Sequence, residues 1–373
     1  MSKPRVNILT PIPFWHPGTT EYINCLNSEG YKVVALDVWR FNFYDEERII
    51  HNLVPKVFKG FFARAYKRVF RKKFISKYIK SGDIVDIQWC GHYYAKYMDT
   101  IKAQNVKIFA SLFGSDLYRN NNANRLIQRK IFEVADKIVM GVNMQEDFEE
   151  HFPGLSSKIL FAQFGSKRLD MIGEQSKNKK TADIKKKFNI PDSKIVVTIG
   201  YSSKEQQQHL IFLKVLKSIE QTLKDKLFLI FPLTYGVKKE SEYYIKLKKE
   251  IKEIEIDYVC FESRLSEEEL VDTRLISDIT VNLQTTDALS SSIKEAMAAD
   301  NVLLVGKWLP YQIYEELGIY IIRSEINDFE KSFRDILKNL DYHKKKCKRN
   351  KELVLEFASW KHLIKQFISN YNS

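Results

Sequence analysis

The sequence predicts an α/β protein made of two successive Rossmann-like domains, each built on a parallel sheet. Short apolar runs of strand type alternate with helix-type segments along the whole chain. A length of 373 residues is enough for two domains with sizeable cores. A polar, lysine-rich segment at residues 173–194 interrupts the alternation, which then restarts. We therefore expect one domain over residues 1–175 and a second over residues 190–354.

The bulk composition limits the partners and the compartment. The formal net charge of +13 implies an anionic partner: nucleic acid, a membrane surface or a phosphorylated substrate. No apolar run approaches the length of a membrane-spanning helix, and residues 6–10 form a strand rather than part of a signal peptide. The four cysteines are far apart and form no Cys-x-x-Cys pair. This argues against a zinc site or a disulfide framework and fits a reducing cytosol.

The chain opens with a βαβ unit. Residues 6–10 form the first strand, and residues 11–19 form a loop whose three prolines are those of a rigid turn. A helix begins at Thr20 and ends at Gly30, which suits a helix C-terminus. The second strand occupies residues 31–38.

The segment from Pro55 to Lys80 has an unusual composition. Ten of its 26 residues are Lys or Arg, and none is acidic. Its apolar residues fall at helical spacing: Phe58, Phe61, Phe62, Ala65 and Val69. A basic amphipathic helix with aromatic residues is typical of an element that lies on an anionic membrane. The alternative is that the apolar side packs on the sheet with the lysines in solvent. The spacing does not favour a nucleic-acid surface, because the aromatic residues follow a helix face and not a stacking platform.

A strand, polar loop, helix and strand follow one another near the C-terminus. Residues 278–283 and 301–306 alternate like buried strands, and residues 293–299 have high helix propensity. The helix is preceded by three candidate capping residues, Ser290, Ser291 and Ser292. A helix N-terminus at the carboxyl end of a parallel sheet presents free N–H groups and a partial positive charge. This arrangement suits a phosphate group.

The same stretch resembles the donor-sugar loop of retaining GT-B glycosyltransferases, glycosyltransferase family 4 in particular. That family has a Glu-x7-Glu motif ending in Glu-Ala-Met-Ala; here Glu295 begins the sequence Glu-Ala-Met-Ala, and Asp287 stands eight residues earlier. The resemblance implies that Glu295 binds the nucleotide ribose and that Asp287 faces the donor sugar. Asp in place of Glu keeps the carboxylate and shortens its reach. The alternative needs no ligand, since Ser292 and Glu295 also have capping-box spacing.

The resemblance extends to other positions of the second domain. The strand at residues 194–200 leads into the glycine turn Gly200-Tyr201-Ser202, where the backbone approaches a pyrophosphate. The family has a basic residue just after this glycine that neutralises the leaving diphosphate, and Lys204 matches it; the alternative is a solvated surface lysine. Three further donor-binding positions follow the next two strands: Thr234 and Tyr235 after the first, and Glu262 after the second. In this fold the end of the second strand usually meets the nucleobase.

Two positions of the first domain match the family as well. His92 follows the strand at residues 83–89, and the resemblance places it at the donor sugar. Gly114-Ser115-Asp116 resembles the family's His-Gly-Ser/Thr-Asp turn, with Phe113 in place of the His, and Asp116 is then near the acceptor or the sugar. For His92, the alternative is a loop histidine without a special role. For Asp116, it is the N-cap of the helix that continues through residue 134.

The resemblance implies a GT-B fold, with two Rossmann-like domains facing across a cleft and a terminal helix, residues 355–373, that crosses back onto the first domain. Such an enzyme moves a sugar from a nucleotide-diphosphate donor to a saccharide acceptor with retention of configuration. Because the basic segment from Pro55 to Lys80 is typical of a membrane-bound element, we expect the acceptor to be lipid-linked. The pathway we expect is the synthesis of a bacterial surface polysaccharide (lipopolysaccharide or capsule). We expect a cytoplasmic protein at the inner face of the membrane. No Asp-x-Asp motif occupies a suitable loop, so we expect neither metal nor cofactor.

Two other classes of protein stay open. One is a GT-B epimerase or hydrolase that acts on the nucleotide sugar, against which the basic segment argues. The other is a non-enzymatic protein whose basic faces bind nucleic acid. The chain has no Walker-type phosphate loop and no Gly-x-Gly-x-x-Gly, which argues against a nucleotide hydrolase or a dehydrogenase.

Overall fold

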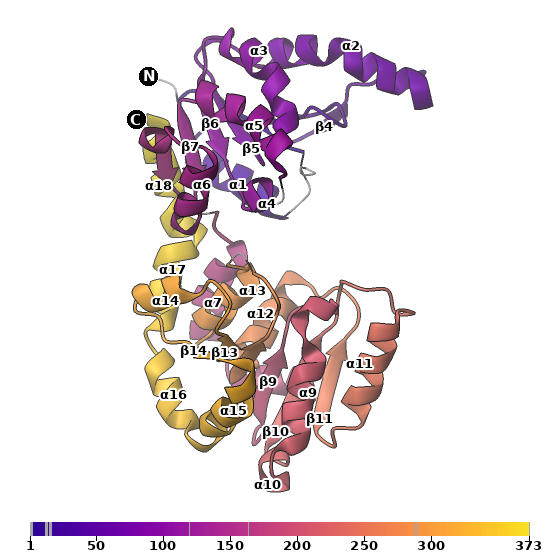
Figure 1. Ribbon diagram of the computed structural model, residues 1–373, viewed down its shortest axis with the longest axis vertical. Helices are drawn as coiled ribbons and strands as arrows, with labels where there is room; N and C mark the ends of the chain where they lie inside the picture. Colours follow the sequence, from indigo (N-terminus) through magenta and orange to yellow (C-terminus); the bar gives the residue numbers. More distant parts are fainter. Residues whose placement is uncertain are drawn as a thin grey trace. The chain divides into compact units, whose positions relative to one another are not determined.

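The computed structural model describes residues 3–11, 14, 17–118, 120–162, 164–287 and 289–372 (Figure 1). The chain divides into two compact units. The first unit comprises Met1–Gly165 together with Trp360–Ser373, and the second comprises Ser166–Ser359. Each unit has its own sheet and its own apolar core.

The first unit is built on an eight-stranded sheet in the order β4-β3-β2-β1-β5-β6-β7-β8. All neighbours from β2 to β8 pair in parallel, whereas β3 and β4 add an antiparallel edge. The central strands are buried along their whole length, as expected for a parallel sheet covered on both faces. The strands are β1 (Val6–Leu9), β2 (Val33–Asp37), β3 (Asn42–Tyr44), β4 (Ile50–Asn52), β5 (Ile84–Gln88), β6 (Lys107–Ser111), β7 (Lys137–Met140) and β8 (Ile159–Phe161).

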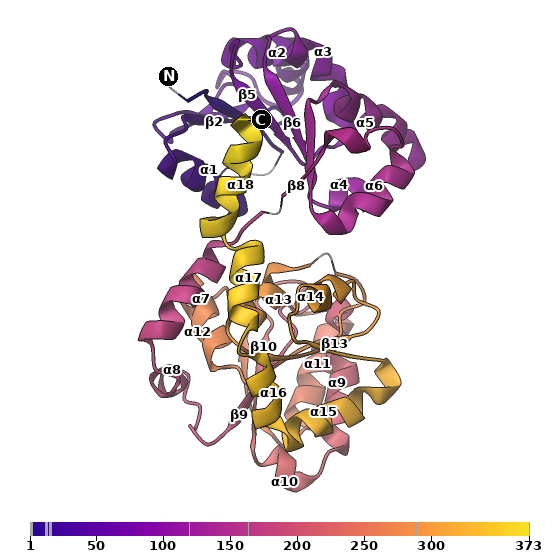
Figure 2. The ribbon, with the colours of Figure 1, turned by 90° about the vertical axis from the view of Figure 1, so that its left-hand side faces the viewer.

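Helices cover both faces of this sheet. One face carries α2 (Gly60–Tyr78), α3 (Met98–Lys102), α5 (Asn122–Val134) and α6 (Gln145–His151), whose apolar residues form one core cluster. The opposite face carries α1 (Pro17–Ser28) and α18 (Trp360–Asn372), which lie side by side (Figure 2). Helix α1 begins at Pro17 rather than at Thr20. Of the proline-containing loop expected before it, residues 12, 13, 15 and 16 lie outside the described residues.

Buried polar contacts fix the C-terminal helix to the first sheet. The Asp86 carboxylate in β5 accepts hydrogen bonds from Tyr22 of α1 at 2.9 Å, from Tyr371 of α18 at 3.1 Å and from Ser111 of β6 at 2.6 Å. Residues 355–373, expected as one helix, form two: α17 (Asn350–Ala358) belongs to the second unit, and α18 begins after Ser359.

The second unit is a six-stranded, fully parallel sheet in the order β11-β10-β9-β12-β13-β14. In chain order this is the 3-2-1-4-5-6 arrangement of the doubly wound Rossmann fold, in which ligands bind where the strand order reverses. The reversal lies between β9 and β12. The strands are β9 (Ile195–Ile199), β10 (Leu227–Pro232), β11 (Asp257–Phe261), β12 (Ile279–Asn282), β13 (Val302–Gly306) and β14 (Ile322–Ser324).

The lysine-rich segment at residues 173–194 is not a linker between the units. It contains the end of α7 (Lys167–Asn178) and all of α8 (Thr181–Lys187), and the division falls at residues 165 and 166 instead. The reason is that Leu169 and Ile172 pack against the apolar side of α13 (Ser291–Ala298). The lysines pair with acidic residues of α12 (Glu267–Ile276). A high lysine content therefore marked a solvated helix face here.

Candidate functional site

Two loops meet where the strand order of the second unit reverses. The loop after β9 begins at Gly200, whose φ is +64°; a Cβ there would lie 2.9 Å from Gln207 Oε1 and 3.1 Å from His209 Nε2. The Tyr201 hydroxyl donates to Gln284 Oε1 at 2.7 Å, and Gln207 Nε2 donates to the same oxygen at 3.0 Å. Because Gln284 belongs to the loop after β12, these bonds hold the two loops together. Only glycine fits at the crowded turn that opens the first loop.

The loop after β12 contains Asp287, the predicted sugar-facing residue. Its carboxylate accepts the backbone N–H of Ser290 at 3.1 Å and the hydroxyl of Tyr311. Leu289, just before the N-cap, has φ of +56°, a strained value for a side chain of its size. Residue 288 lies outside the described residues. Asp287 therefore anchors the entry into α13, and its predicted contact with a sugar stays a prediction.

Glu295 lies in the second turn of α13 and is almost completely buried. Its Oε1 accepts from Arg168 Nε at 2.5 Å, and its Oε2 accepts from Arg274 Nε at 3.3 Å. The capping-box alternative is wrong, because Ser290 is the N-cap residue and no side chain caps this helix. A ribose at Glu295 would share the carboxylate with the two arginines, so the predicted ribose contact stays a prediction.

Several buried polar atoms around these loops have no hydrogen-bond partner within the described part of the chain. They are Ser202 Oγ, His209 Nε2, Gln284 Nε2 and Ser290 Oγ. An unpaired buried polar atom costs about 1–3 kcal/mol, so such atoms are few in native proteins. Four of them lie near the carboxyl ends of β9 and β12, where solvent or a ligand can supply their partners. Ser291 and Ser292 are the half-buried first residues of α13 beside this cluster.

Lys204 and Tyr235 lie next to each other on neighbouring loops. Lys204 Nζ is 6.0 Å from the centre of the Tyr235 ring, and Ser203 donates to the Tyr235 carbonyl through both its N–H and its hydroxyl. Lys204 is exposed and forms no ion pair with any described residue. Thr234, the residue before Tyr235, is half-buried. This exposure leaves Lys204 available to a ligand. A solvated surface lysine would be exposed in the same way.

Glu262 does not share the surroundings of the other predicted donor residues. It follows β11, the edge strand that is separated from β9 by β10. Its carboxylate pairs with Lys248 at 2.6 Å and with Lys239 at 3.1 Å. Hydrogen bonds from these two lysines lower the pKa of Glu262 to about 2. The side chain is therefore engaged, and the structure gives no support to a nucleobase contact through its carboxylate.

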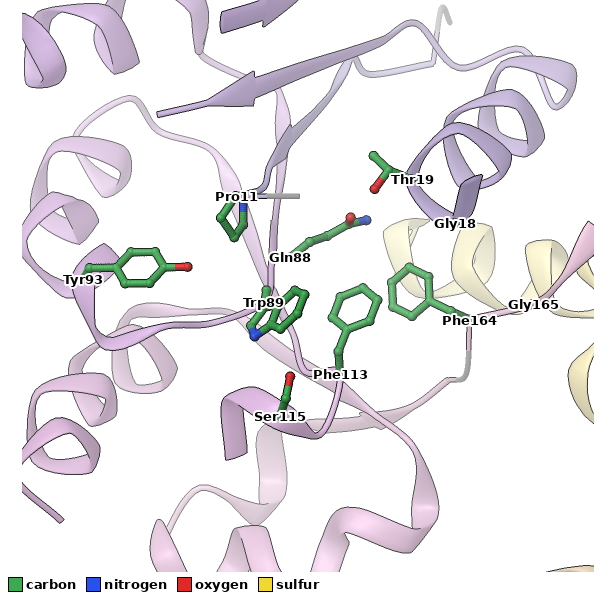
Figure 3. A pocket seen from close by; sticks show the side chains of 10 residues that line it. All are labelled: Pro11, Gly18, Thr19, Gln88, Trp89, Tyr93, Phe113, Ser115, Phe164 and Gly165. Atoms are coloured by element: carbon green, nitrogen blue, oxygen red, sulfur yellow. The ribbon is translucent and has the colours of Figure 1, made fainter. Parts of the chain in front are cut away.

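The first unit contains a cavity of about 680 Å³ at the carboxyl edge of its sheet (Figure 3). Trp89, Phe113 and Phe164 follow one another along it; the ring centres of Phe113 and Phe164 are 4.3 Å apart. Trp89 has φ of +60°, which is strained for so large a residue and is typical of functional positions. Gln88 is buried beside it, and its Nε2 has no hydrogen-bond partner among the described residues. An aromatic cavity with few polar groups is typical of a ligand site.

The structure shows what holds Asp116, and its predicted place near the acceptor or the sugar stays a prediction. Its Oδ1 accepts the N–H of Phe113 and its Oδ2 accepts the N–H of Cys90, both at 2.9 Å. Burial raises the pKa of Asp116 to about 6, although these backbone bonds lower it. Asp116 therefore joins the two loops that carry Trp89 and Phe113, and it does not line the cavity. The N-cap alternative is also wrong, because Asn121 caps α5.

His92 is the first residue of a 3-10 helix, His92–Tyr97, and is half-buried. Its ring contacts that of Tyr93 with centres 5.7 Å apart. Tyr93 lines the cavity, whereas His92 is not among the described lining residues. The predicted sugar contact of His92 stays a prediction.

Helix α2 leaves several of its large apolar side chains exposed. Only Phe74 and Ile75, near its C-terminus, are buried, whereas Phe61, Phe62 and Val69 are 70, 67 and 71 % exposed. The first turns extend away from the rest of the first unit (Figure 1). The alternative that the apolar side packs on the sheet therefore holds for part of the helix: Phe74 and Ile75 are buried, and Tyr66 packs against the core of the first unit. None of the described helices combines the length and the apolar character needed to cross a bilayer.

Over the described ranges, no three His, Cys, Asp or Glu side chains converge in a group that could hold a metal ion. Metal independence itself stays a prediction.

Comparisons with known proteins identify the fold. No protein-family model matches the sequence, and no curated protein matches it. Among solved structures, a glycosyltransferase from Rickettsia africae matches with a TM-score of 0.74 at 15% identity, over 100% of this chain and 98% of that one. Sucrose-phosphate synthase from Thermosynechococcus elongatus matches with a TM-score of 0.69 at 13% identity, over 99% and 98%.

A third structure is Anabaena HepE, solved in complex with UDP and glucose. It matches with a TM-score of 0.67 at 9% identity over 100% of both chains. The chain is thus an α/β protein with two parallel-rich sheets that matches GT-B glycosyltransferase structures over its full length. The fold class predicted from the sequence is confirmed.

Several residues at the two sites were not predicted from the sequence. Arg168, Arg274 and Tyr311 contact the predicted carboxylates but lie outside the motif, and Arg168 is 127 positions from Glu295. No local pattern connects residues so far apart.

Proposed function

We propose that this protein is a glycosyltransferase that uses a nucleoside-diphosphate sugar as donor. The observation that carries the proposal is the cluster of unpaired buried polar atoms at the carboxyl ends of β9 and β12. This is the position where Rossmann-type sheets bind nucleotides. The full-length match to GT-B glycosyltransferases supports it, as does the complex of HepE with UDP and glucose.

In the proposed reaction, the bond between the anomeric carbon and the diphosphate oxygen breaks, and its electron pair leaves with the diphosphate. The acceptor hydroxyl forms the new glycosidic bond, and its proton leaves with the diphosphate. Negative charge therefore develops on the leaving group. The N-terminal amides of α13, beside Ser290, and the exposed Lys204 stabilise that charge without reorganisation. Glu295 binds the ribose, and Asp287 faces the sugar. Transfer with retention and without a metal follows from the resemblance to family 4.

We assign the acceptor to the aromatic cavity of the first unit. Sugar rings have apolar faces that cover aromatic rings such as Trp89 and Phe113, and Gln88 Nε2 is available to a hydroxyl group. Asp116 acts as a positioning residue, since it joins the loops that carry both rings.

The acceptor is proposed to be lipid-linked, because of α2. The segment from Pro55 to Lys80, which contains α2, has ten cationic residues and no acidic one, and several of its phenylalanines are exposed. This pattern suits an anionic bilayer surface. We propose that the protein acts at the cytoplasmic face of a bacterial membrane, in the synthesis of a surface polysaccharide.

The test is a transfer assay with UDP-, GDP- and dTDP-sugars and a bacterial lipid extract. We expect one donor to release its nucleoside diphosphate, with the sugar recovered in the lipid fraction. Release of free sugar without an acceptor, or conversion of the donor into its epimer, would instead show the hydrolase or epimerase. No turnover of any donor, together with salt-dependent binding of arbitrary DNA, would support the nucleic-acid alternative.

A further inference from the structure

Tyr311 connects the loop after β13 to the carboxylate of Asp287. It is completely buried and immediately precedes helix α14 (Gln312–Glu316). Its hydroxyl donates a hydrogen bond to Asp287 Oδ2. The side-chain amide of Asn282, the last residue of β12, donates to the same hydroxyl at 3.0 Å. A phenylalanine would fill the same space, so packing alone does not explain the hydroxyl.

The direction of these hydrogen bonds follows from the groups themselves. Asn282 Oδ1 accepts the backbone N–H of Gln284 at 3.2 Å, which leaves the amide nitrogen of Asn282 to face Tyr311. A hydroxyl has one proton to donate, and an ionised carboxylate only accepts. Burial raises the pKa of Tyr311 well above its ordinary value, and the charge of Asp287 raises it further. The Tyr311 hydroxyl therefore keeps its proton and donates it to Asp287.

The two oxygens of Asp287 have different surroundings. Oδ2 accepts both the Tyr311 hydroxyl and the backbone N–H of Ser290, the latter at 3.1 Å. Oδ1 accepts no hydrogen bond from any residue that the structure describes. The side chain is half-buried, and Oδ1 is not among the buried polar atoms without a partner, so it faces solvent or a ligand. Two donors on Oδ2 restrict the rotation of the carboxylate and thereby set the direction of Oδ1.

A second contact from the loop after β13 supports this arrangement. Trp308 Nε1 donates to the backbone carbonyl of Gln284 at 2.9 Å. Trp308 and Tyr311 both follow β13, whereas Gln284 and Asp287 both follow the neighbouring strand β12. The loop after β13 therefore holds the loop after β12 at two points. A side chain that is held in this way does not have to be ordered when a substrate binds.

We propose that Tyr311 is a positioning residue for the donor sugar: its hydroxyl holds Asp287 Oδ2, so that Asp287 Oδ1 accepts a hydrogen bond from a hydroxyl group of the sugar. The inference rests on the proposed function, which supplies the nucleotide sugar, and adds Tyr311 and Asn282 to the residues that act on it. Aspartate stands here where family 4 has glutamate. The shorter side chain has fewer rotatable bonds and, with one oxygen held, loses less conformational freedom when the sugar binds.

Calorimetric titration tests the proposal by comparing a nucleotide sugar with its own diphosphate. The probes are the UDP-, GDP- and dTDP-sugars of the transfer assay, together with UDP, GDP and dTDP. The proteins are wild type, Tyr311→Phe, Asp287→Ala and the variant with both changes. The measured quantity is the Kd of the nucleotide sugar divided by the Kd of the diphosphate, which isolates the contribution of the sugar.

We expect Tyr311→Phe to raise this ratio about 10-fold, the effect of one hydrogen bond to a charged group. The Kd of the diphosphate should stay at the wild-type value, because the diphosphate lacks the group that Asp287 contacts. Asp287→Ala should raise the ratio at least as much. The double variant should show no further increase over Asp287→Ala, because Tyr311 acts through Asp287.

The matched control is Tyr314→Phe. Tyr314 is a buried tyrosine of α14 whose ring centre is 5.5 Å from that of Tyr311. Its hydroxyl has no hydrogen-bond partner in the part of the chain that the structure describes. We expect this variant to keep the wild-type ratio. A thermal melt of every variant establishes that it is folded, and Asp287→Ala keeps the inference testable if Tyr311→Phe does not fold.

The possible outcomes separate the inference from the proposed function. An unchanged ratio in Tyr311→Phe or in Asp287→Ala would overturn the inference and leave the transferase proposal intact. Equal weakening of the nucleotide sugar and the diphosphate by Tyr311→Phe would show a structural role and overturn it as well. The same holds for a ratio that Tyr314→Phe raises by the same amount. A wild-type protein that binds neither a diphosphate nor a nucleotide sugar would contradict the proposed function itself.

Discussion

His209 shows how the site constrains a titratable group. Its Nδ1 lies 2.9 Å from the Tyr243 hydroxyl, and its Nε2 is buried against Gly200 without a partner. Burial lowers the pKa of His209 to about 4. His209 is completely buried in the second unit. It also borders the cluster that we assign to the ligand.

The pKa of His209 predicts how stability depends on pH. The unfolded histidine binds a proton below about pH 6.5, whereas the folded one stays neutral down to about pH 4. Between these values the unfolded state binds more protons, so the free energy of unfolding falls as the pH falls. The shift corresponds to roughly 3 kcal/mol. Urea unfolding of wild type and His209→Asn from pH 7 to pH 4 measures it.

We expect the variant to lose this part of the pH dependence. Asn places a polar atom near Tyr243 but does not titrate. Parallel curves of unfolding free energy against pH for the two proteins would contradict the assignment of a neutral, buried His209.

At the level of single residues, the sequence identified candidate site residues better than it identified the residues that contact them. Gly200 and Ser290 were found because turns and helix starts have local signatures. The arginines on Glu295 were not found, because tertiary packing brings α7 and α12 to α13. The hydrogen bond from the Cys90 N–H to Asp116 was not predicted for the same reason, because the two residues lie 26 positions apart.

Among the elements, α2 is the one whose pattern and structure agree most directly. A basic amphipathic helix was predicted from spacing alone, and the structure leaves its first phenylalanines in solvent. An apolar side chain in water is unfavourable by about 25 cal/mol per Å², which a bilayer interface would relieve.

This helix predicts binding to anionic membranes. We expect the protein to sediment with vesicles that contain phosphatidylserine and to be released by high salt, because lysines near an anionic surface each contribute about 1 kcal/mol and salt screens them. The double change Phe61→Ser and Phe62→Ser should reduce sedimentation without changing the melting temperature. The matched control is Leu126→Ser, which removes a 76 % exposed leucine of α5 in the same unit.

Equal sedimentation of the double variant and the Leu126→Ser control would contradict the role of α2. Sedimentation that is the same with neutral and anionic vesicles would contradict the electrostatic part of the account.

Over the whole molecule, the alternation of strands and helices was sufficient to predict the fold class. Apolar strands buried on both faces are local features, and they recur in both units. The antiparallel edge formed by β3 and β4 was not predicted, because those short strands are half-buried or exposed and lack an apolar run. The division at residues 165 and 166 was not predicted either, since lysine content indicated solvent exposure and not a linker.

The central claim is that the second unit binds a nucleoside diphosphate where its strand order reverses. The most direct measurement is the melting temperature of wild type and Glu295→Ala with UDP, GDP and dTDP, with CMP and NADH as controls. A ligand at 100 times its Kd adds about 2.7 kcal/mol to the free energy of unfolding. We predict that one diphosphate raises the melting temperature of wild type and that Glu295→Ala loses the increment. A protein that no diphosphate stabilises, or an increment that Glu295→Ala fully retains, would contradict the claim.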